Sequence, residues 1–330
     1  MNIQQHCIAL LLWLLLLPVT GIAATEGHRD IRVATPWPAQ NTIIAMLGYG
    51  KNIVGTSAVA KRIPLFRQIY PGIVRVPAIA VTTAHEINPE QVIALKTQLL
   101  FIPQNMHLSQ PALLAQAGVK TLALQANSIA ALRERVTLTA KALGPDAEAI
   151  DQYYQHYFDR NIALIQQRLK GLPPAERVRI YHSMGSPLHT TGRPSLNQDW
   201  MDLAGAANIA ERWFPAQKRG AAEVPLEKIV AADPEVIVVM NRKDAETIRQ
   251  SVAWQSTSAL QHQRVYVNPQ GLFWWCRETS EEAIQILWLA KTLYPQRFAD
   301  IDMVKETHDF YQNFFAISLS AQQIARILEP

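Results

Sequence analysis

Side chains that can hold an anion gather in one loop of this 330-residue chain. Arg277 lies there beside Trp274 and Trp275. A guanidinium binds oxyanions and carboxylates bidentately, and indole rings cover the apolar body of a ligand. The pattern therefore favours binding of an anionic ligand. A tryptophan pair that packs in the core beside a surface arginine is the alternative.

Histidines supply the obvious ligands for a bare transition-metal ion, which needs three or four converging His, Asp or Glu side chains. The candidates for ligand contact are His85, His107, His182 and His189, together with Trp37. Each histidine alone also fits a surface or packing position. His182 is the best placed, because it ends a predicted strand.

Motifs for catalysis are incomplete. Gly48-Tyr49-Gly50 lacks the third glycine of a dinucleotide-binding loop, and His85-Glu86 has no second histidine for a zinc-protease helix. Met184-Gly185-Ser186-Pro187 lacks the second glycine that flanks a serine nucleophile. We therefore expect no enzymatic activity, a metal-dependent or serine hydrolase being the least favoured class, and no intrinsic cofactor.

A repeated pattern identifies the elements that position these side chains. Residues 88–102 (NPEQVIALKTQLLFI) and 224–239 (VPLEKIVAADPEVIVV) each carry a proline and an acid near the start, then apolar residues at helical spacing, then an apolar run. Each predicts a short helix followed by a buried strand, the unit of a parallel α/β sheet. One unit in each half predicts two similar lobes, with ligands bound at the carboxyl ends of the strands.

Residues 146–170 predict one long helix, because apolar residues recur at helical spacing and neither Gly nor Pro interrupts them. Such a helix would extend about 37 Å, enough to pass from one lobe to the other. The predicted fold class is α/β, with two Rossmann-like lobes on parallel sheets joined by this connecting helix. The predicted domains are an N-terminal lobe (25–145), the helix (146–172) and a C-terminal lobe (173–330).

The first 24 residues predict an export signal. An apolar run at 8–17 is broken by Pro18 and Gly21, and Ala23 and Ala24 offer two cleavage positions. Residues 1–7 carry no Lys or Arg, so an uncleaved anchor or a misread start is the alternative. We expect the mature protein in the periplasm.

Composition and cysteine count narrow the function classes. Hydrophobic residues make up 49% and charged residues 18%, which is typical of a packed globular protein. The net charge is only +4, and aromatics are not interleaved with basic runs, so no nucleic-acid partner is indicated. Removal of the signal leaves Cys276 as the only cysteine, which excludes an internal disulfide and a CxxC zinc site.

The predicted signal, the two lobes and the long helix between them resemble the helical-backbone substrate-binding proteins of ABC importers, the family of ferric-siderophore, haem and vitamin B12 receptors. The lobe motif of that family is similar to residues 88–92 (NPEQV) and to 225–237 (PLEKIVAADPEVI). The first copy departs from it, since Lys96-Thr97-Gln98 stands where a proline and an acid are usual.

Two further segments carry the resemblance. Residues 203–210 (LAGAANIA) match a second signature of the family. Residues 282–295 are similar to its C-terminal helix, which the capping-box pair Thr279 and Glu282 is predicted to open.

The resemblance implies a function and partners. It implies a monomeric receptor that captures a ferric-siderophore-type iron chelate between its lobes and delivers it to an ABC permease in the inner membrane. Glu90 and Glu227, one on each lobe, would meet arginines of that permease. An acid that only complements a helix dipole is the alternative. Haem, cobalamin, molybdate and a bare transition-metal ion stay open as cargo.

Overall fold

The computed structural model describes residues 31–80, 86–215 and 221–330. The predicted export signal and His85 lie outside these residues. Within them, no helix combines the length and the apolar character needed to cross a membrane.

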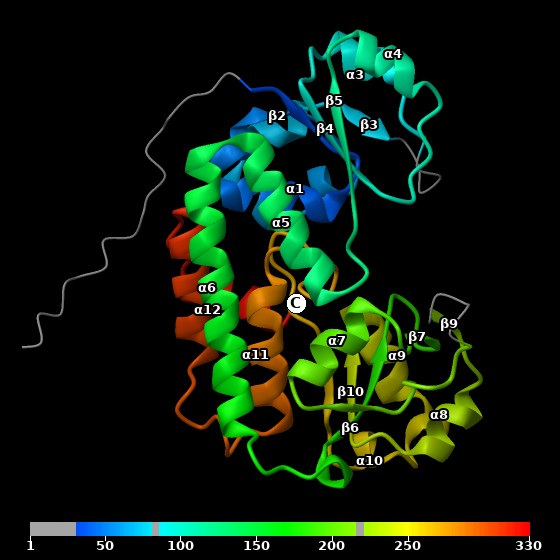
Figure 1. Cartoon of the computed structure of the whole chain (residues 1–330). Helices are drawn as coiled ribbons and strands as arrows, with labels where there is room; N and C mark the ends of the chain where they lie inside the picture. The colour runs from blue at the N-terminus through cyan, green and yellow to red at the C-terminus, as the bar shows by residue number, and fades with distance from the viewer. Residues whose placement is uncertain (1–30, 81–85, 216–220) are drawn as a thin grey trace, which may run out of the picture.

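A five-stranded parallel sheet forms the first lobe (Figure 1), with the strand order β3-β2-β1-β4-β5. The strands are β1 (Val33–Ala34), β2 (Ile53–Ser57), β3 (Ala78–Ala80), β4 (Leu99–Pro103) and β5 (Lys120–Leu124). The helices between them are α1 (Pro38–Ile44), α2 (Pro64–Ile69), α3 (Pro89–Ala94) and α4 (Pro111–Gln116). Each begins with a proline, whose fixed φ suits the first turn of a helix.

The sheet of the second lobe has the order β11-β10-β6-β7-β9, with β8 also paired to β6. Its strands are β6 (Arg179–Ser183), β7 (His189–Thr191), β8 (Ala207–Asn208), β9 (Ala221–Glu223), β10 (Val236–Val239) and β11 (Val265–Val267). The associated helices are α7 (Leu196–Leu203), α8 (Leu226–Ala232), α9 (Arg242–Gln250) and α10 (Ser258–Gln261). The strands β6, β8, β10 and β11 run parallel as predicted, but β7 and β9 form an antiparallel edge.

The predicted helix–strand repeat is confirmed: α3 leads into β4, and α8 leads into β10. Lys96 and Asp233 hold equivalent places in the two copies, and both adopt the left-handed backbone conformation, with φ of 51° and 43°. The turn between helix and strand is therefore the same in both halves. It forms in the first copy although Lys96 replaces the acid.

One uninterrupted helix, α6 (Pro145–Arg168), runs along one side of the molecule between the levels of the two sheets (Figure 1), which confirms the connecting helix. Four further helices complete the fold: α5 (Ile129–Leu143), α11 (Glu282–Leu293), α12 (Met303–Phe315) and α13 (Ala321–Leu328). A single hydrophobic core joins α1, α5, α6, α7, α11, α12 and α13. The domain boundaries drawn from the sequence stay a prediction.

The predicted capping box at the start of α11 is wrong. Glu281 holds the N-cap position, and the hydroxyl of Thr279 accepts a hydrogen bond from the Glu281 amide at 3.1 Å. The Glu282 carboxyl group is fully buried, and neither of its oxygens has a hydrogen-bond partner among the described residues. The acid points into the core instead of back to the helix end.

Candidate ligand-binding site

Residues from both halves lie where parallel strands end, the usual ligand position in open α/β sheets. In the first half, Trp37 follows β1 and precedes α1. In the second half, Met240 follows β10, and Arg277 belongs to the long segment between β11 and α11. These residues form the candidate site.

Arg277 carries the main positive charge of the candidate site. Its side chain is 35% exposed, and its Nε lies 3.5 Å from the Glu278 carboxylate. Its Nη1 faces the sulfur of Met240 at 3.8 Å. Burial works to lower the pKa of Arg277, but the Glu278 charge raises it, and the net shift is upward. The guanidinium is therefore a permanent cation. Its Nη1 faces a weak acceptor, and an oxygen of an oxyanion in that place would accept a stronger hydrogen bond.

A buried carboxylate fixes the first part of the loop that carries Arg277. Glu281 accepts hydrogen bonds from the amides of Leu272 at 2.7 Å and Phe273 at 3.1 Å, and from the hydroxyl of Tyr311. Burial raises the pKa of Glu281 to about 7. The Glu281 side chain thus links the loop to Tyr311 of α12. A Cβ atom at Gly271 would collide with the side chains of both Glu281 and Tyr311.

The two tryptophans beside Arg277 differ in their surroundings. Trp274 is half-buried, and its carbonyl accepts a hydrogen bond from the Arg277 amide at 3.0 Å. Trp275 has no exposed surface, and its indole donates to the Tyr311 hydroxyl at 3.4 Å. Trp275 is therefore a core residue in this conformation, while Trp274 and Trp37 keep exposed surface for a ligand.

His182 is brought close to Arg277 but is fully buried. Its ring stands edge-to-face against Trp200 at 5.0 Å between centroids. Burial, with a contribution from the Arg277 charge, lowers the pKa of His182 to about 3, so the imidazole is neutral. Neither ring nitrogen has a hydrogen-bond partner within the described chain. A neutral, covered ring packs against the site and adds no charge to it.

The other predicted histidines are not brought to Arg277 by these elements. His107 is exposed between β4 and α4, and His189 begins β7, where it pairs with Glu223 of β9. His85 lies outside the described residues. Across those residues, no three His, Cys, Asp or Glu side chains form a group that could hold a metal ion. The bare-ion alternative therefore gains no support here.

Cys276 lies next to Arg277 and is fully buried. Burial raises the pKa of its thiol, despite the opposing charge of Arg277. The group is therefore an uncharged thiol, and its position is that of a core side chain.

The sequence interpretation missed Arg135. This residue lies on α5 with 1% of its surface exposed, and its guanidinium carbon sits 4.0 Å from the centre of the Trp37 ring. It also donates a hydrogen bond to the carbonyl of Glu278. The helical spacing of the sequence could have identified it. Arg135 lies on the same buried face of α5 as Leu132, Val136 and Thr139, and a charged residue on a buried face usually has a specific role.

The predicted docking acids are both exposed. Glu90 lies in the first turn of α3, and Glu227 lies in the first turn of α8. The helices α3 and α8 lie on the same side of the molecule, across from α6 (Figure 1). The docking role stays a prediction, because the same positions suit a carboxylate that complements a helix dipole.

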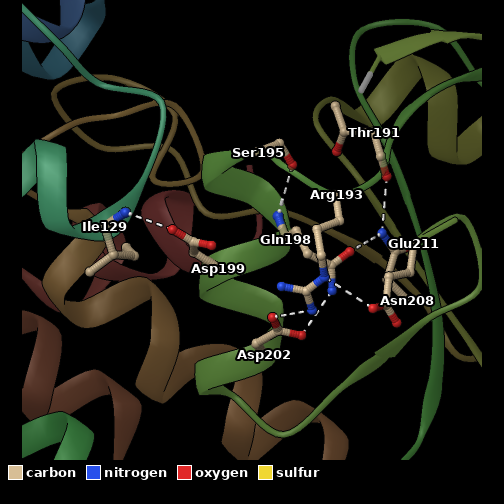
Figure 2. Close-up of polar contacts among 9 residues, drawn as sticks. All are labelled: Ile129, Thr191, Arg193, Ser195, Gln198, Asp199, Asp202, Asn208 and Glu211. Atoms are coloured by element: carbon tan, nitrogen blue, oxygen red, sulfur yellow. Dashed lines mark hydrogen bonds and ion pairs between the residues drawn. The ribbon is translucent and has the colours of Figure 1, made fainter. Parts of the chain in front are cut away.

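The second family signature has a structural role (Figure 2). Asn208 donates to the Thr191 carbonyl at 2.9 Å and to the Gln198 side chain at 2.8 Å. Close by, Arg193 pairs with Asp202 at 2.7 Å and with Glu211 at 3.0 Å. The signature thus fixes α7 to the edge of the second sheet.

The family described as periplasmic binding protein matches residues 33–272. This chain belongs to that family. The predicted resemblance is therefore confirmed at the family level.

Three relatives illustrate the likeness. The molybdate-binding protein MolA of Haemophilus influenzae is 25% identical over 326 residues, covering 92% of this chain and 88% of MolA. The solved structure of MolA with molybdate gives a TM-score of 0.76 at 23% identity, covering 88% and 94%. A periplasmic solute binding protein of Veillonella parvula gives a TM-score of 0.77 at 22% identity, covering 91% of this chain and 92% of the other. CeuE of Helicobacter pylori with Ni(II) gives a TM-score of 0.72 at 19% identity, covering 90% of this chain and 94% of CeuE. These structures share the fold of this chain.

Proposed function

We propose that this protein is the exported receptor of an ABC importer, and that it captures a small metal-containing anion between its lobes. Membership of the periplasmic binding protein family supports the receptor role. The likeness to MolA, described as the molybdate-binding partner of an ABC transporter, extends over almost the whole chain. In this role the protein binds cargo and passes it on without chemical change.

The observation that carries the proposal is the environment of Arg277. This guanidinium is partly exposed where the strands of the second sheet end, and its Nη1 faces the weak acceptor of Met240. An anion that brings two oxygens to the guanidinium gains two charge-assisted hydrogen bonds. It would compete with Glu278, whose carboxylate lies at the Nε edge at 3.5 Å.

A molybdate-type oxyanion is the first cargo that we propose. Its charge and small size suit a site built around one accessible arginine, and the MolA likeness points the same way. The ferric-siderophore-type chelate expected from the sequence is the second. The half-buried indoles of Trp37 and Trp274 favour it, because they offer apolar surface to an organic body.

We also propose that Glu90 and Glu227 dock the receptor on the inner-membrane permease. Each is exposed in the first turn of its helix, and the two helices lie on one side of the molecule. Their equivalent positions in the repeated unit give a symmetric pair of carboxylates, which matches a permease that presents paired arginines.

The test is a titration of the purified protein with molybdate, tungstate, sulfate and a ferric siderophore, followed by calorimetry and thermal melting. We expect molybdate or the ferric chelate to bind and raise Tm, and Arg277→Gln to weaken binding by about tenfold to a hundredfold. Arg168→Gln, which removes a surface pair with Asp300, is the control and should bind as the wild type does. Equal affinity in wild type and Arg277→Gln, or no binding of any probe, would refute the proposal.

A further inference from the structure

One buried guanidinium contacts both halves of the candidate site. Arg135 of α5 lies over the ring of Trp37, which follows β1 in the first half. The same guanidinium donates through Nη2 to the carbonyl of Glu278, the residue after Arg277. Its Nε and Nη1 have no hydrogen-bond partner in the described parts of the chain. Its directional contacts there are therefore the ring and this carbonyl.

The turn that Arg135 holds has an unusual backbone. Glu278 adopts φ of +44°, a left-handed conformation that costs free energy for any residue except glycine. A side chain with a β carbon keeps such a conformation only where its surroundings impose it. The hydrogen bond from Arg135 to the Glu278 carbonyl is one contact that does so, and the orientation of Arg277 depends on this turn.

The residues after the turn are also tied to the first half of the chain. The Ser280 amide donates to the Thr42 hydroxyl of α1 at 3.1 Å, and the Tyr154 hydroxyl of α6 donates to the Ser280 carbonyl at 3.0 Å. The residues before the turn are held by Glu281 at the amides of the loop. Arg277 therefore lies between two fixed segments, and Arg135 holds the Glu278 peptide between them through its carbonyl.

We propose that Arg135 is a positioning residue of the ligand site: it does not touch the cargo, but holds Trp37 and the Arg277–Glu278 turn in their relative places. This inference rests on the proposed function, in which Arg277 holds the anion. The competing role is a purely structural one, in which Arg135 only neutralises the buried Glu282. If Arg135 is a positioning residue, changing it loosens the turn and weakens ligand binding. If its role is purely structural, the turn and the affinity stay as in the wild type.

Hydrogen exchange of the ligand-free protein tests the turn directly. The amides of Arg277 and Ser280 are both hydrogen-bonded, so their exchange is protected in the wild type. In Arg135→Lys a cation stays near Trp37, but one ammonium cannot both lie over the ring and replace the planar fork. We expect exchange of the Arg277 and Ser280 amides to accelerate by about tenfold or more. Unchanged exchange there would overturn the proposal.

Arg133→Lys is the matched control for that measurement. Arg133 lies two residues earlier on α5, but it faces α6, where it pairs with Asp159 at 2.8 Å and with Gln155 at 2.7 Å. The same substitution on the same helix should leave the Arg277 and Ser280 amides protected. Equal acceleration in both variants would mean that α5 as a whole is loosened, and would overturn the role assigned to Arg135.

A double-mutant cycle with Arg277 tests the link to the ligand, with molybdate as the probe. We expect Arg135→Lys to weaken binding by about tenfold. If Arg135 acts through Arg277, the double variant Arg135→Lys with Arg277→Lys binds no more weakly than Arg277→Lys alone. Additive losses would show that Arg135 acts independently and would overturn the proposal. If the wild type binds no molybdate, the proposed oxyanion cargo fails, while hydrogen exchange still decides the positioning role.

A second variant covers the case in which the loss of one buried charge unfolds the protein. Arg135→Met combined with Glu282→Gln removes both buried ionisable groups together. If this variant is folded by circular dichroism and shows rapid exchange at the Arg277 and Ser280 amides, the positioning role stands. If it is folded and these amides stay protected, Arg135 only balanced Glu282, and the proposal is wrong.

Discussion

The carboxylate of Asp199 in α7 accepts a hydrogen bond from the backbone amide of Ile129, the first residue of α5, at 3.0 Å (Figure 2). A side chain of the second half thereby caps a helix of the first half. The contact adds a charged group at the positive end of that helix. Burial raises the pKa of Asp199, and the Ile129 hydrogen bond opposes this shift.

Removal of this cap should destabilise the protein modestly. We expect Asp199→Ala to lower the free energy of unfolding by about 1 kcal/mol, because the amide of Ile129 loses its acceptor. Asp199→Asn keeps an acceptor and should lose less. Urea denaturation at neutral pH measures both. An Asp199→Ala protein as stable as the wild type would show that water replaces the carboxylate at no cost.

Glu281 should make the protein less stable as the pH rises. Its folded-state pKa of about 7 lies above its ordinary value. Its contribution to the free energy of unfolding is therefore full below about pH 4.5 and is lost as pH rises toward 7. In that window the contribution falls by about 1.4 kcal/mol per pH unit. Glu281→Gln removes this dependence, because an amide does not titrate. Denaturation curves of both proteins from pH 4.5 to 7 should therefore differ in slope, and parallel curves would contradict the assignment.

His182 should act in the opposite direction. Its folded-state pKa of about 3 lies below the ordinary value, so its contribution is full above about pH 6.5 and is lost as pH falls toward 3. We expect His182→Phe to keep the edge-to-face contact with Trp200 and to remove the loss below pH 6.5. Thermal melting of the two proteins at pH 7 and pH 5 measures this. A loss of stability at pH 5 that is as large in His182→Phe as in the wild type would rule out the buried neutral imidazole.

The docking acids should matter for transport and not for binding. We expect the double variant Glu90→Ala with Glu227→Ala to bind cargo with wild-type affinity and to lose uptake in cells. The control is Glu134→Ala with Glu246→Ala, which removes the same charge from exposed sites on α5 and α9. Uptake and affinity are measured in parallel for both pairs. Equal uptake by the two double variants would contradict the docking role.

The elements that the sequence predicted are those with local, periodic signals. The helix–strand repeat and α6 follow from apolar spacing, and they appear with nearly the predicted bounds. The antiparallel strands β7 and β9 have three residues each, which is too short for a period to appear. Their pairing depends on contacts between residues about thirty positions apart, such as His189 with Glu223.

The site was harder to predict than the fold, for a physical reason. Arg277 was found because it lies beside Trp274 and Trp275 in one loop, so its signal is local in the sequence. Arg135 was missed because its partners are distant in the chain: Trp37 is 98 positions before it, and Glu278 is 143 positions after it. Trp275 and His182 were chosen for their chemistry, but burial is set by the helices packed on them, which no local pattern reveals.

Two of the C-terminal helices, α11 and α12, pack against α6, and α12 also packs against the segment that follows α1, so residues 282–315 complete a core that residues 33–47 begin. A chain that crosses a membrane N-terminus first cannot close this core until its C-terminal part has also crossed. An N-terminal fragment that lacks residues 282–315 would leave this core open, and we expect such a fragment not to fold by itself.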